Sequence, residues 1–169
     1  WLMPGGRLYR IVVAGVCWFA LALQFQLFVF DPAPPDAATA VINFFSYFTI
    51  LSNILVALAM TFGVFEPGAS GPARFFNRPD VRAAIALYIV VVGLVYAFVL
   101  SGRWSPEGWR LVADRLLHYA IPVLYVVDWI ALTPKAGLSM SRVPFWLIFP
   151  GVYGLYAIAR GTLTGYYPY

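Results

Sequence analysis

Long apolar segments separated by short polar loops dominate the chain. Five of them have near-spanning length: roughly Leu8 to Phe30, Val41 to Phe62, Ala83 to Leu100, Arg110 to Thr133 and Val143 to Leu163. Because about 20 mostly apolar residues suffice to cross the hydrocarbon core of a bilayer, each segment predicts a transmembrane helix. The loops are rich in Pro, Gly and charged residues, and no internal repeat is evident. The pattern predicts an all-α fold, a polytopic transmembrane helix bundle that forms a single domain over residues 1–169.

The composition agrees with this fold class. Hydrophobic residues make up 62% of the 169 residues and charged residues only 11%, which excludes an ordinary soluble domain. The net charge of +4 is explained by basic loops, so we expect membrane lipids as partners and no nucleic acid. The single cysteine, Cys17, is expected to face lipid or pack between helices. The ends at Trp1 and Tyr169 are typical of a segment truncated at both ends.

The basic residues predict the orientation of the helices. With the N-terminus inside the cell, seven Lys and Arg residues fall on the cytoplasmic side and four on the outer side. The inner set is Arg7, Arg10, Arg74, Arg78, Arg82, Lys135 and Arg142, and the outer set is Arg103, Arg110, Arg115 and Arg160. Because cytoplasmic loops carry an excess of basic residues, we expect an integral plasma-membrane protein with a cytoplasmic N-terminus.

The second apolar segment carries a polar stripe. Read as one continuous helix at about 100° per residue, it places four polar side chains within an arc of about 120°: Asn43, Ser46, Thr49 and Asn53. Unpaired polar groups are costly in lipid, so this stripe should face protein or a cavity. One interpretation is helix–helix contact, since Ser, Thr and Asn commonly hydrogen-bond between spans. The other is a functional site.

The fourth segment has a matching polar face. Asp114, His118, Tyr125 and Asp128 fall within an arc of about 80°, and ionisable groups inside a bilayer normally face an interior path or partner. Pro122 follows His118 by four residues and cannot donate to its carbonyl. We therefore expect the helix to kink beside His118 and leave that carbonyl free for a polar neighbour.

The two polar faces can meet. Thr49 and His118 each lie about eight residues from the outer start of their segments, a depth of roughly 12 Å at 1.5 Å per residue. A threonine hydroxyl beside a neutral imidazole can attack an ester carbonyl, with Thr49 as nucleophile and His118 as general base. Asp114, one helical turn from His118, is the candidate to orient the ring. Asp128 lies about 15 Å farther along the helix and is too distant for this.

Other roles stay open for several residues. Ser46 or Asn53 is a candidate oxyanion donor. The histidine could instead be a packing donor, part of a proton path, or a metal or cofactor ligand. With one His and one Cys in the chain, a closed metal site would need carboxylates or another subunit, so we expect neither metal nor cofactor. Arg160 is expected to snorkel to lipid phosphate, the alternatives being a pair with Asp114 or with a substrate carboxylate.

Three features, in order along the chain, resemble the androgen-induced-gene family of membrane proteins and its bacterial relatives. They are residues 47–53 (Tyr-Phe-Thr-Ile-Leu-Ser-Asn), His118 followed ten residues on by Asp128 with a proline between, and residues 164–169 (Thr-Gly-Tyr-Tyr-Pro-Tyr). The animal members are multi-pass threonine hydrolases that cleave fatty acid esters of hydroxy fatty acids. The resemblance therefore implies Thr49 and His118 as the catalytic pair, a bacterial plasma membrane, and six spans in the full-length protein, the last after residue 169.

Two functions from different classes follow from these observations. The first is an intramembrane hydrolase of fatty acyl esters that uses Thr49 and His118 on a lipid ester substrate. The alternative is a non-enzymatic membrane subunit or lipid-binding scaffold, in which the polar faces pin helices together or hold a membrane-protein partner. Space discriminates between them, because an enzyme needs a cavity that touches both residues, whereas a scaffold would pack the two faces tightly.

Overall fold

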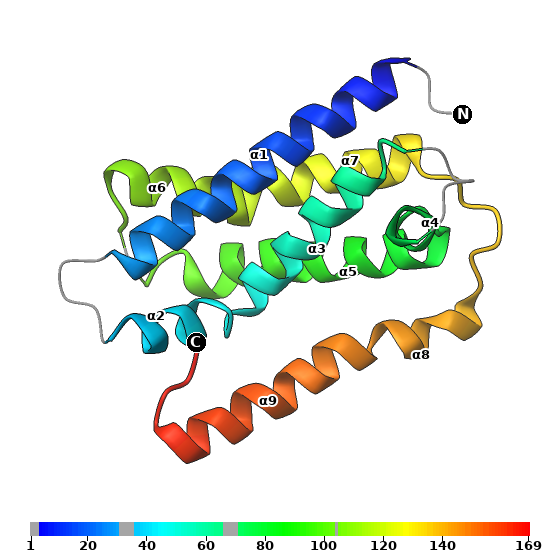
Figure 1. The fold of residues 1–169 in the computed structure, drawn as a ribbon. Helices are drawn as coiled ribbons and strands as arrows, with labels where there is room; N and C mark the ends of the chain where they lie inside the picture. The colour runs from blue at the N-terminus through cyan, green and yellow to red at the C-terminus, as the bar shows by residue number, and fades with distance from the viewer. Residues whose placement is uncertain (1–3, 31–35, 66–70, 104) are drawn as a thin grey trace.

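The computed structural model describes residues 4–30, 36–65, 71–103 and 105–169, and every regular element in these ranges is a helix. The elements are α1 (Pro4–Val29), α2 (Ala37–Phe44), α3 (Phe48–Phe62), α4 (Pro72–Phe76), α5 (Pro79–Val95), α6 (Gly108–Arg115), α7 (Ile121–Leu132), α8 (Val143–Trp146) and α9 (Ile148–Thr164) (Figure 1). A π-helical turn, Tyr96–Leu100, extends α5, and a second, Leu116–Ala120, joins α6 to α7. The predicted all-α fold is confirmed.

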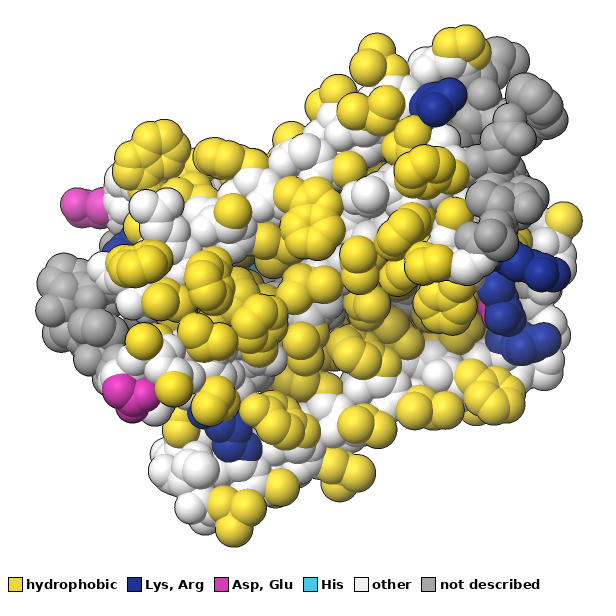
Figure 2. All heavy atoms as spheres, viewed as in Figure 1, with side chains coloured by type: hydrophobic (Ala, Val, Ile, Leu, Met, Phe, Trp, Pro, Cys, Tyr) yellow, Lys and Arg dark blue, Asp and Glu magenta, His cyan; other side chains and the backbone are white. Residues whose placement is uncertain are grey.

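The helices are long and apolar enough for an integral membrane protein. Four runs could cross a bilayer unaided: Pro4–Val29, Pro79–Leu100, Gly108–Leu132 and Met140–Thr164. Hydrophobic side chains cover most of the face in Figure 2, and charged side chains gather mainly toward its left and right ends. A surface of this kind is stable against lipid and not against water. These runs match four of the five predicted spans to within a few residues.

The second predicted span, Val41 to Phe62, is not one helix. The structure breaks it into α2 and α3, which meet at an angle of 69° across residues 45–47. The prediction of one continuous polar stripe is therefore wrong, because the residues before and after the break lie on helices with different axes. Asp36 caps the start of α2, where its carboxylate accepts from the Thr39 backbone N–H (3.0 Å) and hydroxyl (2.7 Å). These hydrogen bonds hold the pKa of Asp36 below its usual value.

The core lies among α1, α3, α5 and α7, which pack side by side. Small residues let these helices approach closely, among them Ala14, Cys17 and Ala20 on α1 and Ala57 on α3, all buried. Cys17 is fully buried and so packs between helices, one of the two roles expected for it. In contrast, α9 stands at the edge of the bundle (Figure 1), and Gly161 is its one buried residue.

The end of α9 directs the last residues back toward the bundle. Gly165 adopts φ +72°, the left-handed conformation in which glycine avoids a steric penalty, and its N–H donates to the Gly161 carbonyl (2.9 Å). A Cβ on Gly161 would lie 2.0 Å from the Tyr167 ring, so only glycine leaves room for that ring. The turn brings Tyr166 and Tyr169 to the start of α3, where they hydrogen-bond to Tyr47 and Thr49.

Candidate functional site

Side chains of α9 form hydrogen bonds with the residues at the break between α2 and α3. Backbone groups that leave a helix inside a membrane need partners from the protein. The Tyr153 hydroxyl donates to the Ser46 carbonyl (3.0 Å), and the Arg160 guanidinium donates to Asn43 Oδ1 (2.5 Å) and to Ser46 Oγ. The prediction that Arg160 snorkels to lipid phosphate is wrong, because its fork-shaped guanidinium binds Asn43 near the end of α2 and Ser46 within the break instead.

This break places Thr49 at the start of a helix. Thr49 is the second residue of α3, so its backbone N–H has no partner within the helix. The Tyr169 hydroxyl oxygen accepts a hydrogen bond from that N–H (3.1 Å), and the hydroxyl also pairs with Thr49 Oγ1 (3.1 Å). Thr49 therefore has its hydroxyl and a backbone donor at the same point.

His118 lies within the π-helical turn Leu116–Ala120. In this turn the Ile121 N–H donates to the Leu116 carbonyl, so the next donor in the same register would be residue 122, a proline with no N–H. The Leu117 carbonyl of this turn accepts from Asn53 Nδ2 (3.3 Å). A polar neighbour from α3 thus contacts the backbone beside the histidine, and the release of the His118 carbonyl itself by Pro122 stays a prediction.

The imidazole of His118 is held on two sides. Its Nδ1 lies 3.0 Å from the Asp114 carbonyl oxygen and 3.2 Å from the Asp114 carboxylate. The Tyr96 ring stacks on the imidazole, with ring centroids 3.9 Å apart and planes at 14°. The Tyr96 hydroxyl donates to the other carboxylate oxygen of Asp114 (2.7 Å). These contacts use Nδ1 and leave Nε2 without a hydrogen-bond partner among the described residues.

A cavity of about 830 Å³ brings Thr49 and His118 together. Its wall is mostly apolar, with contributions from α1, α2, the two π-helical turns and the last residues of the chain. Its lining includes Thr49, His118, Asp114, Tyr96, Tyr166, Tyr169, Arg103 and Arg110. In the described part of the chain, Thr49 Oγ1 pairs with Tyr169 and makes no direct hydrogen bond to His118. The cavity supplies the space that distinguishes a site from two tightly packed faces.

The other residues predicted for the site lie outside this lining. Ser46 is bound to Arg160 and to the Tyr156 hydroxyl (2.7 Å), and Asn53 is fully buried with Nδ2 bound to the carbonyls of Thr49 (2.8 Å) and Leu117. Both are therefore committed to holding the helices, and neither lies where it could donate to an oxyanion in the cavity. Tyr125 and Asp128 are also fully buried, but at a different place in the bundle.

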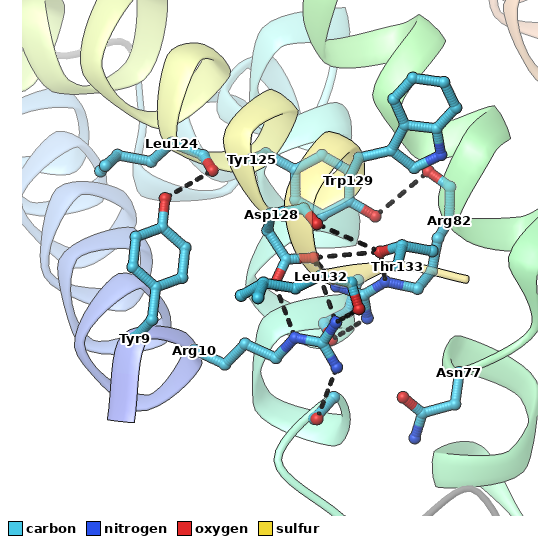
Figure 3. A network of polar contacts seen from close by, with 12 residues as sticks. Tyr9, Arg10, Asn77, Arg82, Leu124, Tyr125, Asp128, Trp129, Leu132 and Thr133 are labelled. Atoms are coloured by element: carbon cyan, nitrogen blue, oxygen red, sulfur yellow. Dashed lines mark hydrogen bonds and ion pairs between the residues drawn. The ribbon is translucent and has the colours of Figure 1, made fainter. Parts of the chain in front are cut away.

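Asp128 lies at the centre of a charged network with Arg10 and Arg82 (Figure 3). One carboxylate oxygen accepts from Arg10 Nε (2.6 Å) and the other from Arg82 Nη2 (2.5 Å), and both arginines are almost completely buried. Thr133 and several backbone carbonyls accept the remaining guanidinium protons, among them those of Gly63 and Ala59. Tyr125 donates to the Arg82 carbonyl at the same place (3.3 Å).

Sequence reasoning missed this network. It assigned Arg10 and Arg82 to the cytoplasmic set of basic residues, as though both lay in water. The available signal was their position, because Arg10 and Arg82 lie within helical runs that could cross a membrane, as does Asp128. Opposite charges on three such helices are expected to pair, since an unpaired charge in lipid is costly. Among the described residues, no group of three or more His, Cys, Asp or Glu side chains lies together as a metal site would require.

Comparison with protein-family models, with curated proteins and with solved structures finds no match to this chain. Function must therefore be argued from the cavity and its side chains.

Proposed function

We propose that this chain is an intramembrane hydrolase of fatty acyl esters, with Thr49 as nucleophile and His118 as general base. The observation that carries the proposal is the single cavity lined by both side chains, with Nδ1 of His118 occupied by Asp114 and Nε2 available. The apolar wall suits an acyl chain. The resemblance to the androgen-induced-gene family, carried by residues 47–53, His118 and residues 164–169, points to the same pair.

The reaction would proceed in two balanced steps. Thr49 Oγ1 attacks the ester carbonyl while His118 Nε2 accepts the hydroxyl proton, and the resulting imidazolium then protonates the departing alcohol. Water next attacks the acyl-threonine and loses a proton to His118, and the imidazolium returns that proton to Thr49 Oγ1 as the bond to the acyl carbon breaks and the fatty acid leaves. For the first step Thr49 exchanges its contact with Tyr169 for one with His118. Such hydrogen bonds commonly form only when substrate is bound.

The start of α3 supplies stabilisation for the oxyanion. The Thr49 backbone N–H is one donor, and the positive end of the helix dipole adds to it. Tyr169 now occupies this donor with its hydroxyl oxygen, so a substrate carbonyl oxygen would displace it or share its place. The role expected of Ser46 and Asn53 thus passes to a backbone donor created by the helix break.

The substrate would enter sideways from the bilayer. A long-chain ester partitions into lipid, and most of the cavity wall is apolar. With a cytoplasmic N-terminus, Thr49 and His118 would lie in the outer-leaflet half of a bacterial plasma membrane. Lipid esters are then the partners of this protein, with no cofactor taking part.

The test is fatty acid release from a panel of long-chain esters by purified protein in detergent or vesicles. We expect Thr49→Ala and His118→Ala each to lower kcat/KM by at least about 10³-fold, and Thr49→Ser to keep part of the activity. Thr61→Ala is the matched control, since Thr61 lies on the same helix, outside the cavity lining. Wild-type protein that cleaves no ester, or activity that survives both substitutions, would favour the non-enzymatic scaffold.

A further inference from the structure

A second cavity meets the first at Thr49. It measures about 450 Å³ and lies between α5 and α9. The two cavities share five lining residues: Thr49, Tyr96, Leu100, Arg103 and Tyr169. The candidate nucleophile therefore stands where two separate spaces join, and a molecule bound at Thr49 has two directions in which to extend.

The two spaces differ in chemistry. The second cavity is lined by four valines of α5 and the π-helical turn after it, and elsewhere by Phe48, Pro150 and Tyr153. The valines are Val91, Val92 and Val95 on α5 and Val99 in the turn. We call this the valine groove. Among its described lining residues there is no imidazole or carboxylate, whereas His118 and Asp114 line the first cavity. Val91, Val95 and Val99 are 40%, 43% and 54% exposed, so the valine groove is open on the side that faces lipid.

We propose that the valine groove is the subsite for the acyl chain and that the first cavity holds the alcohol part of the ester. This inference rests on the proposed hydrolysis. The departing alcohol oxygen must receive its proton from His118 Nε2, so the alcohol arm lies on the side where His118 stands. The acyl arm extends from the other side of the same carbonyl carbon, and the valine groove is the space available there.

The assignment also accounts for the second half of the reaction. When the alcohol leaves the first cavity, the space beside His118 becomes free for the water that His118 activates. The acyl chain stays in the valine groove and keeps the carbonyl carbon at Thr49. The substrate class that fits is an ester with a long apolar group on both sides of the carbonyl, in place of an ester of a short or strongly polar alcohol.

Two series of esters test the assignment with the full chain in vesicles. One varies the acyl chain from 4 to about 18 carbons with a fixed alcohol, and the other varies the alcohol with a fixed acyl chain. Val95→Phe fills the valine groove, and Leu27→Phe is the matched control, since Leu27 lines only the first cavity. We expect Val95→Phe to lower kcat/KM for the longest acyl chains by roughly tenfold or more relative to short ones, with the alcohol preference unchanged. Leu27→Phe should change the alcohol preference alone.

The outcomes separate this inference from the proposed function. Wild-type protein that hydrolyses esters, with a Val95→Phe variant that leaves the acyl preference unchanged or alters the alcohol preference instead, would overturn the assignment and leave the hydrolase intact. Wild-type protein that cleaves nothing would overturn both. Val91→Phe, in the same groove, serves as a second variant if Val95→Phe does not fold, and is expected to shift the acyl preference in the same direction.

Discussion

Asp114 contacts His118 through both its backbone and its side chain. The backbone carbonyl pairs with His118 Nδ1 (3.0 Å), and the carboxylate lies 3.2 Å from the same nitrogen. The carboxylate also accepts from the Tyr96 hydroxyl (2.7 Å), and Tyr96 stacks on the imidazole. The carbonyl orients the ring, and the carboxylate supplies the negative charge that stabilises the imidazolium formed during acyl transfer. Asp114 is thus a positioning residue, which acts on the substrate through His118.

Asp114→Asn is expected to lower kcat by roughly 10²- to 10⁴-fold while KM changes little, because the negative charge that stabilises the imidazolium is lost but the cavity keeps its shape. Steady-state kinetics that separate kcat from KM check this expectation. A variant with an unchanged kcat and a raised KM would mean that Asp114 serves only the shape of the cavity.

Asp128 is a residue of another kind, since it supports the bundle away from the cavity. It contacts both Arg10 and Arg82, and all three residues are at most 3% exposed. Asp128→Asn leaves two buried guanidinium groups without a counter-charge, and the expected loss of stability is about 3–5 kcal/mol.

Thermal and denaturant unfolding in mild detergent measures the Asp128→Asn effect. The matched control is Asp80→Asn, which removes the exposed Arg78–Asp80 pair (2.7 Å) and should cost about 0–1 kcal/mol. Equal and small effects for the two substitutions would show that the Arg10–Asp128–Arg82 network does not stabilise the fold.

At the scale of elements, the break between α2 and α3 depends on α9. Arg160 and Tyr153 bind Asn43 and Ser46, and Thr49 begins its helix directly after the break. Arg160→Met removes both side-chain contacts, and each hydrogen bond to a charged group is worth roughly 1.5–3 kcal/mol. We expect a loss of stability in that range or above, together with lower hydrolysis because Thr49 is no longer held in place.

Arg142→Met is the control for Arg160→Met. Arg142 is exposed and lies directly before α8, at the opposite end of the helical run Met140–Thr164 from Arg160. Unfolding in detergent and ester hydrolysis are measured on both variants. Arg160→Lys should restore little, because one ammonium group cannot reproduce the two-pronged contact of a guanidinium. Full stability and activity in Arg160→Met would mean that the break persists without α9.

The sequence allowed four spans to be placed within a few residues, because apolar length is a property of each segment alone. It also placed Thr49 and His118 on polar faces, and the structure brings both to one cavity. The break at residues 45–47 could not be predicted, since these residues are Phe, Ser and Tyr and include no Pro or Gly. The partners that stabilise it come from α9, more than 100 positions away, and Tyr169, which binds Thr49, lies still farther along the chain, after α9.

At the scale of the whole molecule, the orientation in the membrane decides which leaflet supplies the substrate. The structure changes the basis of the charge argument, because Arg10, Arg82 and Arg160 are used inside the protein. Removing two arginines from the seven inner basic residues leaves five, and removing Arg160 from the four outer ones leaves three. The remaining excess still favours a cytoplasmic N-terminus, and with that orientation the cavity would lie in the outer-leaflet half.

Cysteine labelling in intact cells measures this orientation. Cys17 is the single cysteine of the chain and is fully buried, so a Cys17→Ala parent gives a clean background. A membrane-impermeant maleimide should label Ser101→Cys, after α5, in intact cells, and Ser139→Cys, after α7, only once the cells are permeabilised. Both positions are exposed and lie at opposite ends of the helical run Gly108–Leu132. The reverse pattern would move the cavity to the cytoplasmic half of the bilayer, and the substrate would then come from the inner leaflet.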